Sequence, residues 1–378
     1  MRTVGVEEEL FLVDAATGQP RAVAAEVLHV AAAHGEASND PTHQAVHDIT
    51  RGALVHELQQ EQLETLTPPE SQMDGLEADL RRWRDIAIAR AGEVGAQVMA
   101  SGTSPFPVEP QLVHTTRYDR MADRFGLTTS EQLTCGCHVH VQVESMEEAV
   151  GVLDRIRVWL PTLLALSANS PFWRGKDTGY DSFRSQTQVR WPTAGPTELF
   201  GSVAGYRRYL ADVLESGVPL DEGMVYTDAR LSRRYPTVEV RVADVCSDVR
   251  DAVLIAALCR GLVQTAAREY AAGMPPPLVS TTVLRLADWQ AGKAGITADL
   301  VDPLSGRPRP ARAVLDALVD HVGVALCECG DAALVDEGVR RVVKRGTGAT
   351  VQRATLDRTG SLTEVVAALV RTTAGDEG

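Results

Sequence analysis

The chain has 378 residues, of which 44% are hydrophobic and 23% charged, as in soluble globular proteins with a sizeable core. Its formal net charge of −14 argues against nonspecific nucleic-acid binding, which needs a basic surface. No apolar run approaches the roughly 20 residues that cross a membrane. The six cysteines do not form a disulfide framework, so we expect reduced thiols and a cytoplasmic location.

The first predicted strand, residues 4–13, carries carboxylates on one face. Glu7 and Glu9 share that face because side chains alternate along a strand. The apolar neighbours Val6 and Leu10 place the strand inside a sheet rather than at a solvated edge. Two carboxylates on a central strand favour Mg²⁺ or Mn²⁺, which prefer oxygen ligands.

A second strand is expected at about 54–65, then a helix within 72–98 capped by Asp74, and a strand at 96–101. The acidic residues between His56 and Pro68 do not alternate. By pattern alone, this stretch is an exposed polar strand or the start of a helix.

A central strand at 134–143 places His138 and His140 on one face. The nearby Cys135 and Cys137 suggest a zinc site as an alternative. Cys137 and His138 point to opposite faces of a regular strand, which disfavours zinc. Satisfied structural histidines are the other interpretation.

A helix with a leucine stripe from Leu153 to Leu163 ends before Pro171, and a long irregular connection fills 167–200. Such connections are usually functional. Its cations are candidates for binding phosphate or carboxylate groups, or else solvated surface charges: Arg174, Lys176, Arg184 and Arg190.

The last predicted strand, 236–243, places Glu239 and Arg241 on one face, as a structural ion pair or as a metal ligand beside a phosphate-binding arginine. A helix with a stripe at 254–262 follows, capped by Ser247 or Asp248. Because these strands alternate between polar and apolar residues, we predict a largely antiparallel sheet with helices on one side and a functional site on the other.

Five motifs in chain order resemble those of the type 2 glutamate–cysteine ligase family of carboxylate–amine ligases. They are Gly5-Val6-Glu7-Glu8-Glu9, Leu63-Glu64-Thr65-Leu66-Thr67-Pro68, Cys137-His138-Val139-His140-Val141, Ser170-Pro171-Phe172-Trp173 with Asp177-Thr178-Gly179, and Thr237-Val238-Glu239-Val240-Arg241-Val242. The similarity runs from residue 3 to about residue 370.

The resemblance implies an α+β fold like the catalytic domain of glutamine synthetase, with a curved, mostly antiparallel sheet forming a funnel and helices outside. One domain would span residues 1–372, followed by a flexible tail at 373–378. The implied reaction uses ATP and Mg²⁺ or Mn²⁺ to convert a carboxylate, that of glutamate, to an acyl phosphate, which a small amine such as cysteine then attacks. A homo-oligomer is left open.

The resemblance also assigns roles. The implied metal ligands are Glu7, Glu9, Glu57, Glu64, His138 and Glu239. Arg241 would meet the transferring phosphate, Glu239 and Arg241 would be catalytic, and Arg184 and Arg230 would contact substrate or phosphate. Ser104 departs from a histidine found in relatives, so this departure puts the amine specificity in question.

Two other functions fit the same residues. One is a metal-dependent hydrolase that uses the histidines and glutamates, and the other is a non-catalytic relative that binds nucleotide or metal without turnover. The sequence does not contain the Gly-x-x-x-x-Gly-Lys-Ser/Thr phosphate loop or the Gly-x-Ser-x-Gly nucleophile turn.

Overall fold

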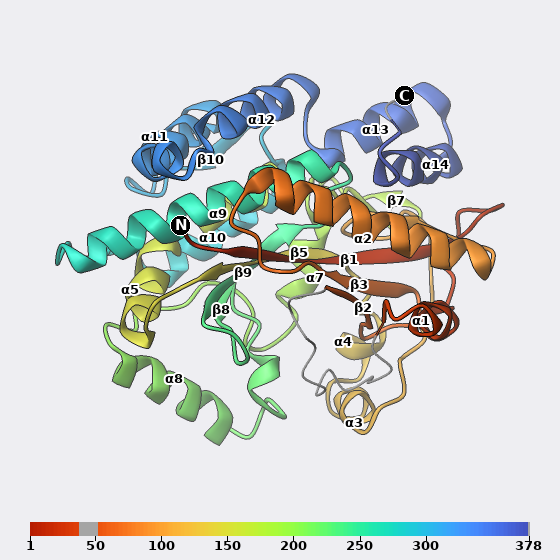
Figure 1. Ribbon diagram of the computed structural model, residues 1–378, viewed down its shortest axis with the longest axis horizontal. Coiled ribbons are helices and arrows are strands. Elements are labelled where there is room, and N and C mark those ends of the chain that lie inside the picture. Colours follow the sequence, from red (N-terminus) through yellow and green to blue (C-terminus); the bar gives the residue numbers. More distant parts are fainter. Residues whose placement is uncertain (38–51, 377–378) are drawn as a thin grey trace.

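The computed structural model describes residues 1–37 and 52–376, and an antiparallel sheet runs through the middle of this part (Figure 1). Its strand order is β2-β3-β1-β5-β9-β8, and β4 pairs with β1 beyond one end of β3. The strands are β1 Val4–Asp14, β2 Ala53–His56, β3 Gln62–Leu66, β4 Ala96–Met99, β5 Gly136–Gln142, β8 Ala229–Leu231 and β9 Thr237–Asp244. Every pairing within this sheet is antiparallel, which confirms the predicted sheet type.

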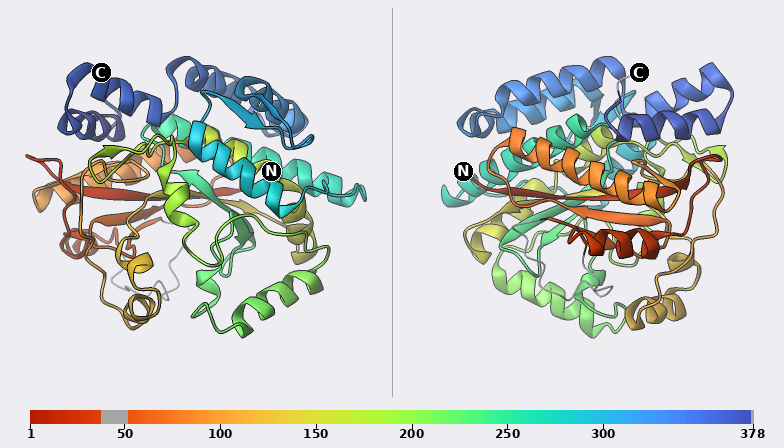
Figure 2. Two further views of the ribbon diagram at one scale, coloured as in Figure 1. Left: turned by 180° about the vertical axis from the view of Figure 1, so that it is seen from behind. Right: turned by 45° about the vertical axis from the view of Figure 1, so that its right-hand side comes forward.

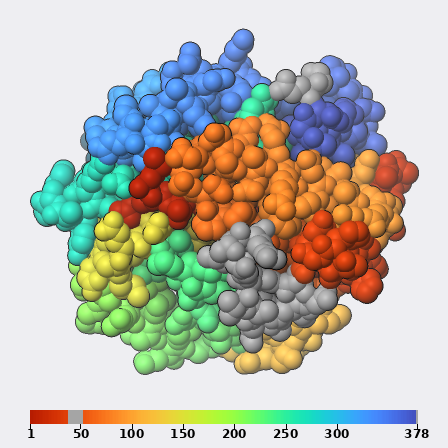
Figure 3. Space-filling model, viewed as in Figure 1, coloured from red at the N-terminus to blue at the C-terminus, as the bar shows by residue number. Residues whose placement is uncertain are grey.

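Helices cover one face of the sheet in two layers. The layer next to the sheet holds α2 Met73–Glu93, α5 Met146–Ile156, α6 Leu160–Ser167, α9 Val249–Ala271 and α10 Thr281–Ala294. An outer layer holds α11 Ala311–Cys329, α12 Ala332–Arg345 and α13 Gly348–Thr359, whereas α14 Leu362–Thr373 packs against β4. Both views in Figure 2 keep the C-terminal helices on the same side of the sheet, and in Figure 3 α2 crosses the middle of the molecular surface (orange).

Shorter elements lie around the other face and the edges. They are α1 Ala24–Ala33, α3 Thr116–Phe125, α4 Leu127–Ser130, α7 Phe183–Gln188, α8 Val203–Glu215, a 3₁₀ turn at Glu222–Met224, and the small hairpin β6 Phe172–Trp173 with β7 Lys176–Asp177. A second hairpin, β10 Asp299–Val301 with β11 Pro308–Pro310, packs against α10 and α11 on the helix-covered side (Figure 1). None of the described helices is long and apolar enough to cross a membrane.

Alternation gives the sheet one apolar and one polar face. Val6, Val139 and Val240 are paired in a row across β1, β5 and β9, and all are buried in the core shared with α6 and α9. The intervening residues of the same strands therefore face the opposite side, away from the covering helices. This face holds the candidate site.

Three local predictions were wrong. The segment expected as one strand at 54–65 forms two, β2 and β3, joined by a turn over residues 57–61. The helix expected up to Pro171 is interrupted at residues 157–159, just before Pro161, which lies in the first turn of α6 and has no N–H to donate. Asp74 lies in the first turn of α2, whose N-cap is Gln72.

Other local predictions hold. Asp248 caps α9 by accepting a hydrogen bond from the backbone amide of Arg250. All six cysteines are free thiols. The flexible tail at 373–378 stays a prediction, and its first residue, Thr373, closes helix α14 with a buried hydroxyl that accepts a hydrogen bond from the Ala100 amide.

Candidate active site

The strand register places the charged side chains of the polar face side by side. Facing Cα partners on neighbouring strands are Glu9 with Glu64, Glu7 with His138, His140 with Glu239, and Glu239 with Arg230. Directly opposed residues of antiparallel strands have Cβ atoms about 4.5–5.5 Å apart. Residues far apart in the sequence therefore form one continuous row across β3, β1, β5, β9 and β8.

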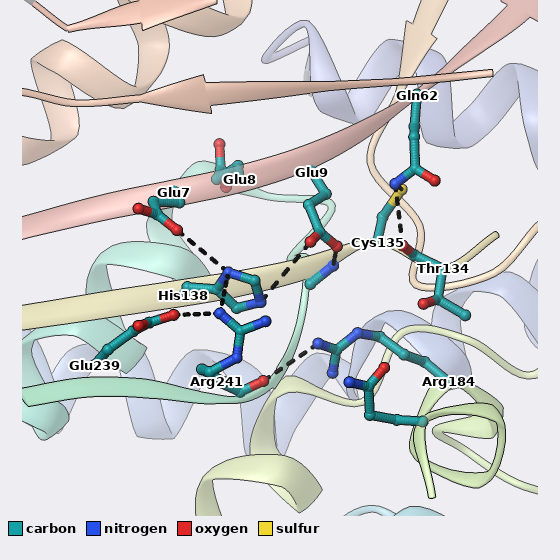
Figure 4. A network of polar contacts seen from close by, with 12 residues as sticks. Glu7, Glu8, Glu9, Gln62, Thr134, Cys135, His138, Arg184, Glu239 and Arg241 are labelled. Carbon is teal, nitrogen blue, oxygen red and sulfur yellow. Dashed lines mark hydrogen bonds and ion pairs between the residues drawn. The ribbon is translucent and has the colours of Figure 1, made fainter. Parts of the chain in front are cut away.

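A β-bulge brings Arg241 into this row. The register between β5 and β9 shifts between Cys137 and Val139, so that Arg241 and Val242 together stand opposite His138. Arg241 Nη1 lies 3.4 Å from His138 Nδ1, and its guanidinium also donates to Glu239 (Figure 4).

The polar face forms the floor of a pocket of about 480 Å³. The predicted residues Glu7, Glu9, Glu57, Glu64, His138, Arg184, Arg230, Glu239 and Arg241 all line it. Residues 115–121 with helix α3, residues 188–191 and residues 223–237 supply the facing walls. Segments from both halves of the chain therefore enclose one cavity, which is large enough for a small-molecule ligand.

Two groups of potential metal ligands occur among the described residues, and they share Glu7. One group is Glu7, Glu64 and His138, and the other is Glu7, His140 and Glu239; within each, the ligand atoms lie within 4.8 Å of one another. Glu7 Oε2 lies 3.4 Å from His138 Nδ1, and Glu7 Oε1 lies 3.1 Å from His140 Nε2. Carboxylate oxygens suit hard divalent cations such as Mg²⁺ and Mn²⁺, and the imidazoles add nitrogen ligands of the kind that transition metals prefer.

The electrostatics of the carboxylates point the same way. Burial, and then the charges of Glu7, Glu57 and Glu9, raise the pKa of Glu64 well above its ordinary value. Burial and Glu9 raise the pKa of Glu57 to about 8. Burial lowers the pKa of His138, and Arg241 lowers it further, which favours the neutral imidazole that coordinates metals. Raised pKa values mark carboxyl groups crowded in a buried site, and a bound divalent cation would favour their ionised forms.

Arginines balance the charge on the opposite side of the site. Arg230 donates to both oxygens of Glu239, at 2.7 and 3.0 Å. Although burial favours its neutral form, Arg241 and Arg230 hold the pKa of Glu239 well below its usual range. Glu239 is therefore an ionised carboxylate, able to bind a cation while it orients two guanidinium groups.

Some predicted residues lie in the pocket but outside the two ligand groups. Glu9 Oε2 accepts a hydrogen bond of 2.5 Å from the Gly136 amide, and Glu9 Oε1 lies 3.9 Å from His138 Nε2. Glu57 lines the pocket next to these acids. Both add an acidic group to the site beside the two ligand groups.

Of the four cations in the 167–200 connection, only Arg184 lines the pocket. Arg174 and Arg190 both pair with Glu131, and Lys176 is exposed. The solvated-surface interpretation therefore holds for the other three cations.

Ser104 is buried, and its hydroxyl donates a hydrogen bond to the backbone carbonyl of Phe106 rather than lining the pocket.

The cysteines take no part in the ligand groups among the described residues. Cys137 is fully buried in the apolar core behind the sheet, on the face opposite His138. Cys135 is buried in a second apolar cluster, and burial raises the pKa of both thiols well above the ordinary value. The structure therefore agrees with the argument from strand alternation against a cysteine-bound zinc.

The sequence did not identify one potential metal ligand, His140, or the apolar wall of the pocket. His140 was paired with His138 by pattern but was not assigned as a ligand, and the structure places it beside Glu7 and Glu239. The wall consists of Leu58, Tyr118, Met121, Trp191 and Tyr226, part of a small third apolar cluster. No local pattern marks this wall, because its members come from four separate segments.

Comparison with known proteins shows the family. Residues 3–371 match the family described as "Glutamate-cysteine ligase family 2(GCS2)". A Streptomyces coelicolor protein named "Putative glutamate--cysteine ligase 2" is 52% identical over 373 residues, covering 99% of each chain. A Paenarthrobacter aurescens protein with a similar name is 48% identical over 373 residues, which is 99% of this chain and 95% of its own.

Solved structures share the fold at low sequence identity. A Francisella tularensis glutamate–cysteine ligase in complex with AMP superposes with a TM-score of 0.66 at 14% identity, over 99% of this chain and 88% of its own. A bifunctional glutathione synthetase from Pasteurella multocida has a TM-score of 0.67 at 14% identity, over 99% of this chain and 52% of its own. The predicted α+β fold is confirmed, and the chain belongs to glutamate–cysteine ligase family 2.

Proposed function

We propose that this chain is an ATP-dependent carboxylate–amine ligase that acts on the γ-carboxylate of glutamate. A carboxylate oxygen attacks the γ-phosphorus of ATP and ADP leaves, giving an acyl phosphate. An amine nitrogen then attacks the acyl carbon, loses a proton, and displaces phosphate, so the products are an amide, ADP and inorganic phosphate. Cysteine is the acceptor suggested by the family name.

The row of carboxylates, imidazoles and arginines across neighbouring strands carries this proposal. Phosphoryl transfer depends mainly on positioning and on neutralising charge, and this row combines anionic metal ligands with guanidinium groups in one pocket. The AMP bound to the Francisella structure of the same fold supports a nucleotide site here.

Each side of the row has its own role. Glu7, Glu64 and His138 would hold one divalent cation, and Glu7, His140 and Glu239 a second. Bound Mg²⁺ would neutralise phosphate charge and polarise the oxygens that it contacts.

Arg241 would contact the phosphoryl group in transfer, because its guanidinium lies between Glu239 and His138. Arg230 keeps Glu239 in place through paired hydrogen bonds to its carboxylate. Both arginines line the pocket, where they would meet a polyphosphate chain.

The test is an ADP-release assay with Mg²⁺, ATP, glutamate and a panel of amines that includes cysteine, with product masses measured. ADP release that requires both glutamate and an amine, with a γ-glutamyl amide as product, is expected. The proposal is wrong if hydrolysis of esters or amides proceeds without ATP, or if ATP binds tightly and no amine gives an amide.

A cytoplasmic location also stays a prediction.

A further inference from the structure

Arg184 is a nearly buried cation at the edge of the pocket. Its side chain is 5% exposed, and its Nη1 and Nη2 donate to the backbone carbonyls of Val242 and Arg241, at 3.3 and 3.2 Å. Among the described residues its buried Nε has no hydrogen-bond partner. Arg184 lines the pocket and keeps this donor unpaired within the described part of the chain, so its guanidinium can bind an anionic ligand there.

Asp244 is the acid that faces Arg184. It is fully buried, and its Oδ1 lies 3.8 Å from Arg184 Nη1. Asp244 stands at the end of β9, so it follows Arg241 in the same strand but does not line the pocket. Its charge therefore acts from behind Arg184.

The same carboxylate ties down the segment that leads to Arg184. Asp244 Oδ2 accepts hydrogen bonds from the Asn169 amide at 2.9 Å and the Ser170 hydroxyl at 2.7 Å, and Oδ1 accepts one from the Ser182 hydroxyl at 2.8 Å. The Arg184 amide in turn donates to the Ser170 hydroxyl at 3.0 Å. Both ends of the 169–184 loop are thus fixed to one anion.

Two glycines leave the space for this arrangement. A Cβ on Gly136 would lie 2.3 Å from Arg184 Nη2, and a Cβ on Gly102 would lie 2.9 Å from Asp244 Oδ2. Either contact is far shorter than van der Waals distance, so only glycine allows Arg184 to lie against β5 and Asp244 to lie under the 101–104 turn.

The loop is also braced from outside. Gln352 on α13 donates to the backbone carbonyl of Asn169 at 3.1 Å and to its Oδ1 at 2.8 Å. The Asn169 side chain donates to the carbonyls of Ala100 and Val245. The outer helices therefore hold the backbone on which Asp244 acts.

We propose that Asp244 is a positioning residue that holds Arg184, through its charge and through the 169–184 loop, where Arg184 binds an anionic group of the substrates. This inference rests on the proposed ligase function only for the identity of that anion, a phosphate or a carboxylate. Asp244 itself contacts no substrate.

The test compares Asp244→Asn with Arg184→Met, the double variant and a matched control, Asp302→Asn. Asp302 is likewise buried, accepts hydrogen bonds from two backbone amides and pairs with Arg309. It lies in the β10–β11 turn, remote from the pocket. KM for ATP and glutamate and kcat are measured for each, and the crystal structure of Asp244→Asn is determined.

Asp244→Asn should raise the KM of one anionic substrate roughly tenfold or more, as should Arg184→Met. The substitution removes the charge that faces Arg184 and weakens the hydrogen bonds that Asp244 accepts from the loop. The double variant should be no worse than Arg184→Met, while Asp302→Asn matches the wild type. In the Asp244→Asn crystal structure, the Arg184 guanidinium should leave the carbonyls of Arg241 and Val242. If Asp244→Asn does not fold, Ser182→Ala removes one of its hydrogen bonds and should give the same pattern with a smaller change.

Additive effects of the two substitutions, or an unmoved Arg184 in the crystal structure, would overturn the inference. If the wild type turns over no amine, the ligase proposal fails instead, and the position of Arg184 in the crystal structure still decides the role of Asp244.

Discussion

Glu8 and Arg84 form a buried ion pair on the side of β1 away from the pocket. Their closest atoms lie 2.6 Å apart, and their side chains are 0% and 1% exposed. Arg84 also donates to the carbonyls of Cys246 and Ser247, which precede α9. Figure 4 shows Glu8 pointing away from Glu7 and Glu9. The Glu8–Arg84 pair therefore holds β1 from its other face, directly behind the candidate site.

Glu8→Gln should lower the free energy of unfolding by about 3–5 kcal/mol, because it leaves Arg84 buried without its countercharge. Urea unfolding followed by circular dichroism measures this change. Asp336→Asn, which breaks an exposed pair with Arg340, is the control and should leave the midpoint unchanged. Equal midpoints for both variants would show that the buried pair contributes little.

Glu7 should decide the number of bound metal ions, since both ligand groups use it. Titration calorimetry with Mn²⁺ in the presence of ADP should give two ions for the wild type and one for Glu64→Gln or His140→Asn. Glu7→Gln should bind none. If Glu7→Gln binds as many Mn²⁺ ions as the wild type, Glu7 is not a ligand shared by the two groups.

Arg241→Met should lower kcat about 10³-fold, with a smaller change in KM, because the guanidinium would act mainly on the phosphoryl group in transfer. The ADP-release assay measures both constants. Arg190→Met, which removes a cation paired with Glu131 outside the pocket, should keep wild-type kcat. Equal kcat for both variants would exclude Arg241 from the reaction.

A carboxyl pair outside the pocket should make stability depend on pH. Burial raises the pKa of Asp228 to about 7, and burial and the Asp228 charge raise that of Asp288 well above its ordinary value. Because these folded-state pKa values exceed the unfolded ones, the pair contributes stability below about pH 4 that is lost as pH rises through 7.

Asp288→Asn should reduce this loss, since a neutral amide replaces an acid that must stay protonated beside Asp228. Urea unfolding at pH 5, 6.5 and 8 should show a flatter pH dependence than the wild type. Asp320→Asn, an exposed position on α11, is the control. An unchanged slope for Asp288→Asn would mean that the pair does not hold its proton.

Alternation predicted which side chains share a face, because a strand has a period of two whatever surrounds it. It therefore placed Glu7 with Glu9 and Glu239 with Arg241. The register between strands depends on contacts between distant segments, so the facing of His140 and Glu239 became visible only in the structure.

Positions that act from behind the sheet left no local signal. Asp244 closes the last strand and looks like an ordinary strand end, yet three donors from a distant loop converge on it. Arg84 falls within the helix predicted at 72–98, where a single charge is normally solvated. Both roles depend on tertiary packing that the family motifs do not contain.

The contact between Gln352 and Asn169 has a consequence for biosynthesis. A ribosome must release the chain through α13 before Asn169 meets this partner, so the 169–184 loop gains its outer brace only after that helix has been made. Truncated chains that stop before α13 thus carry every motif of the candidate site but lack the helix that braces the 169–184 loop.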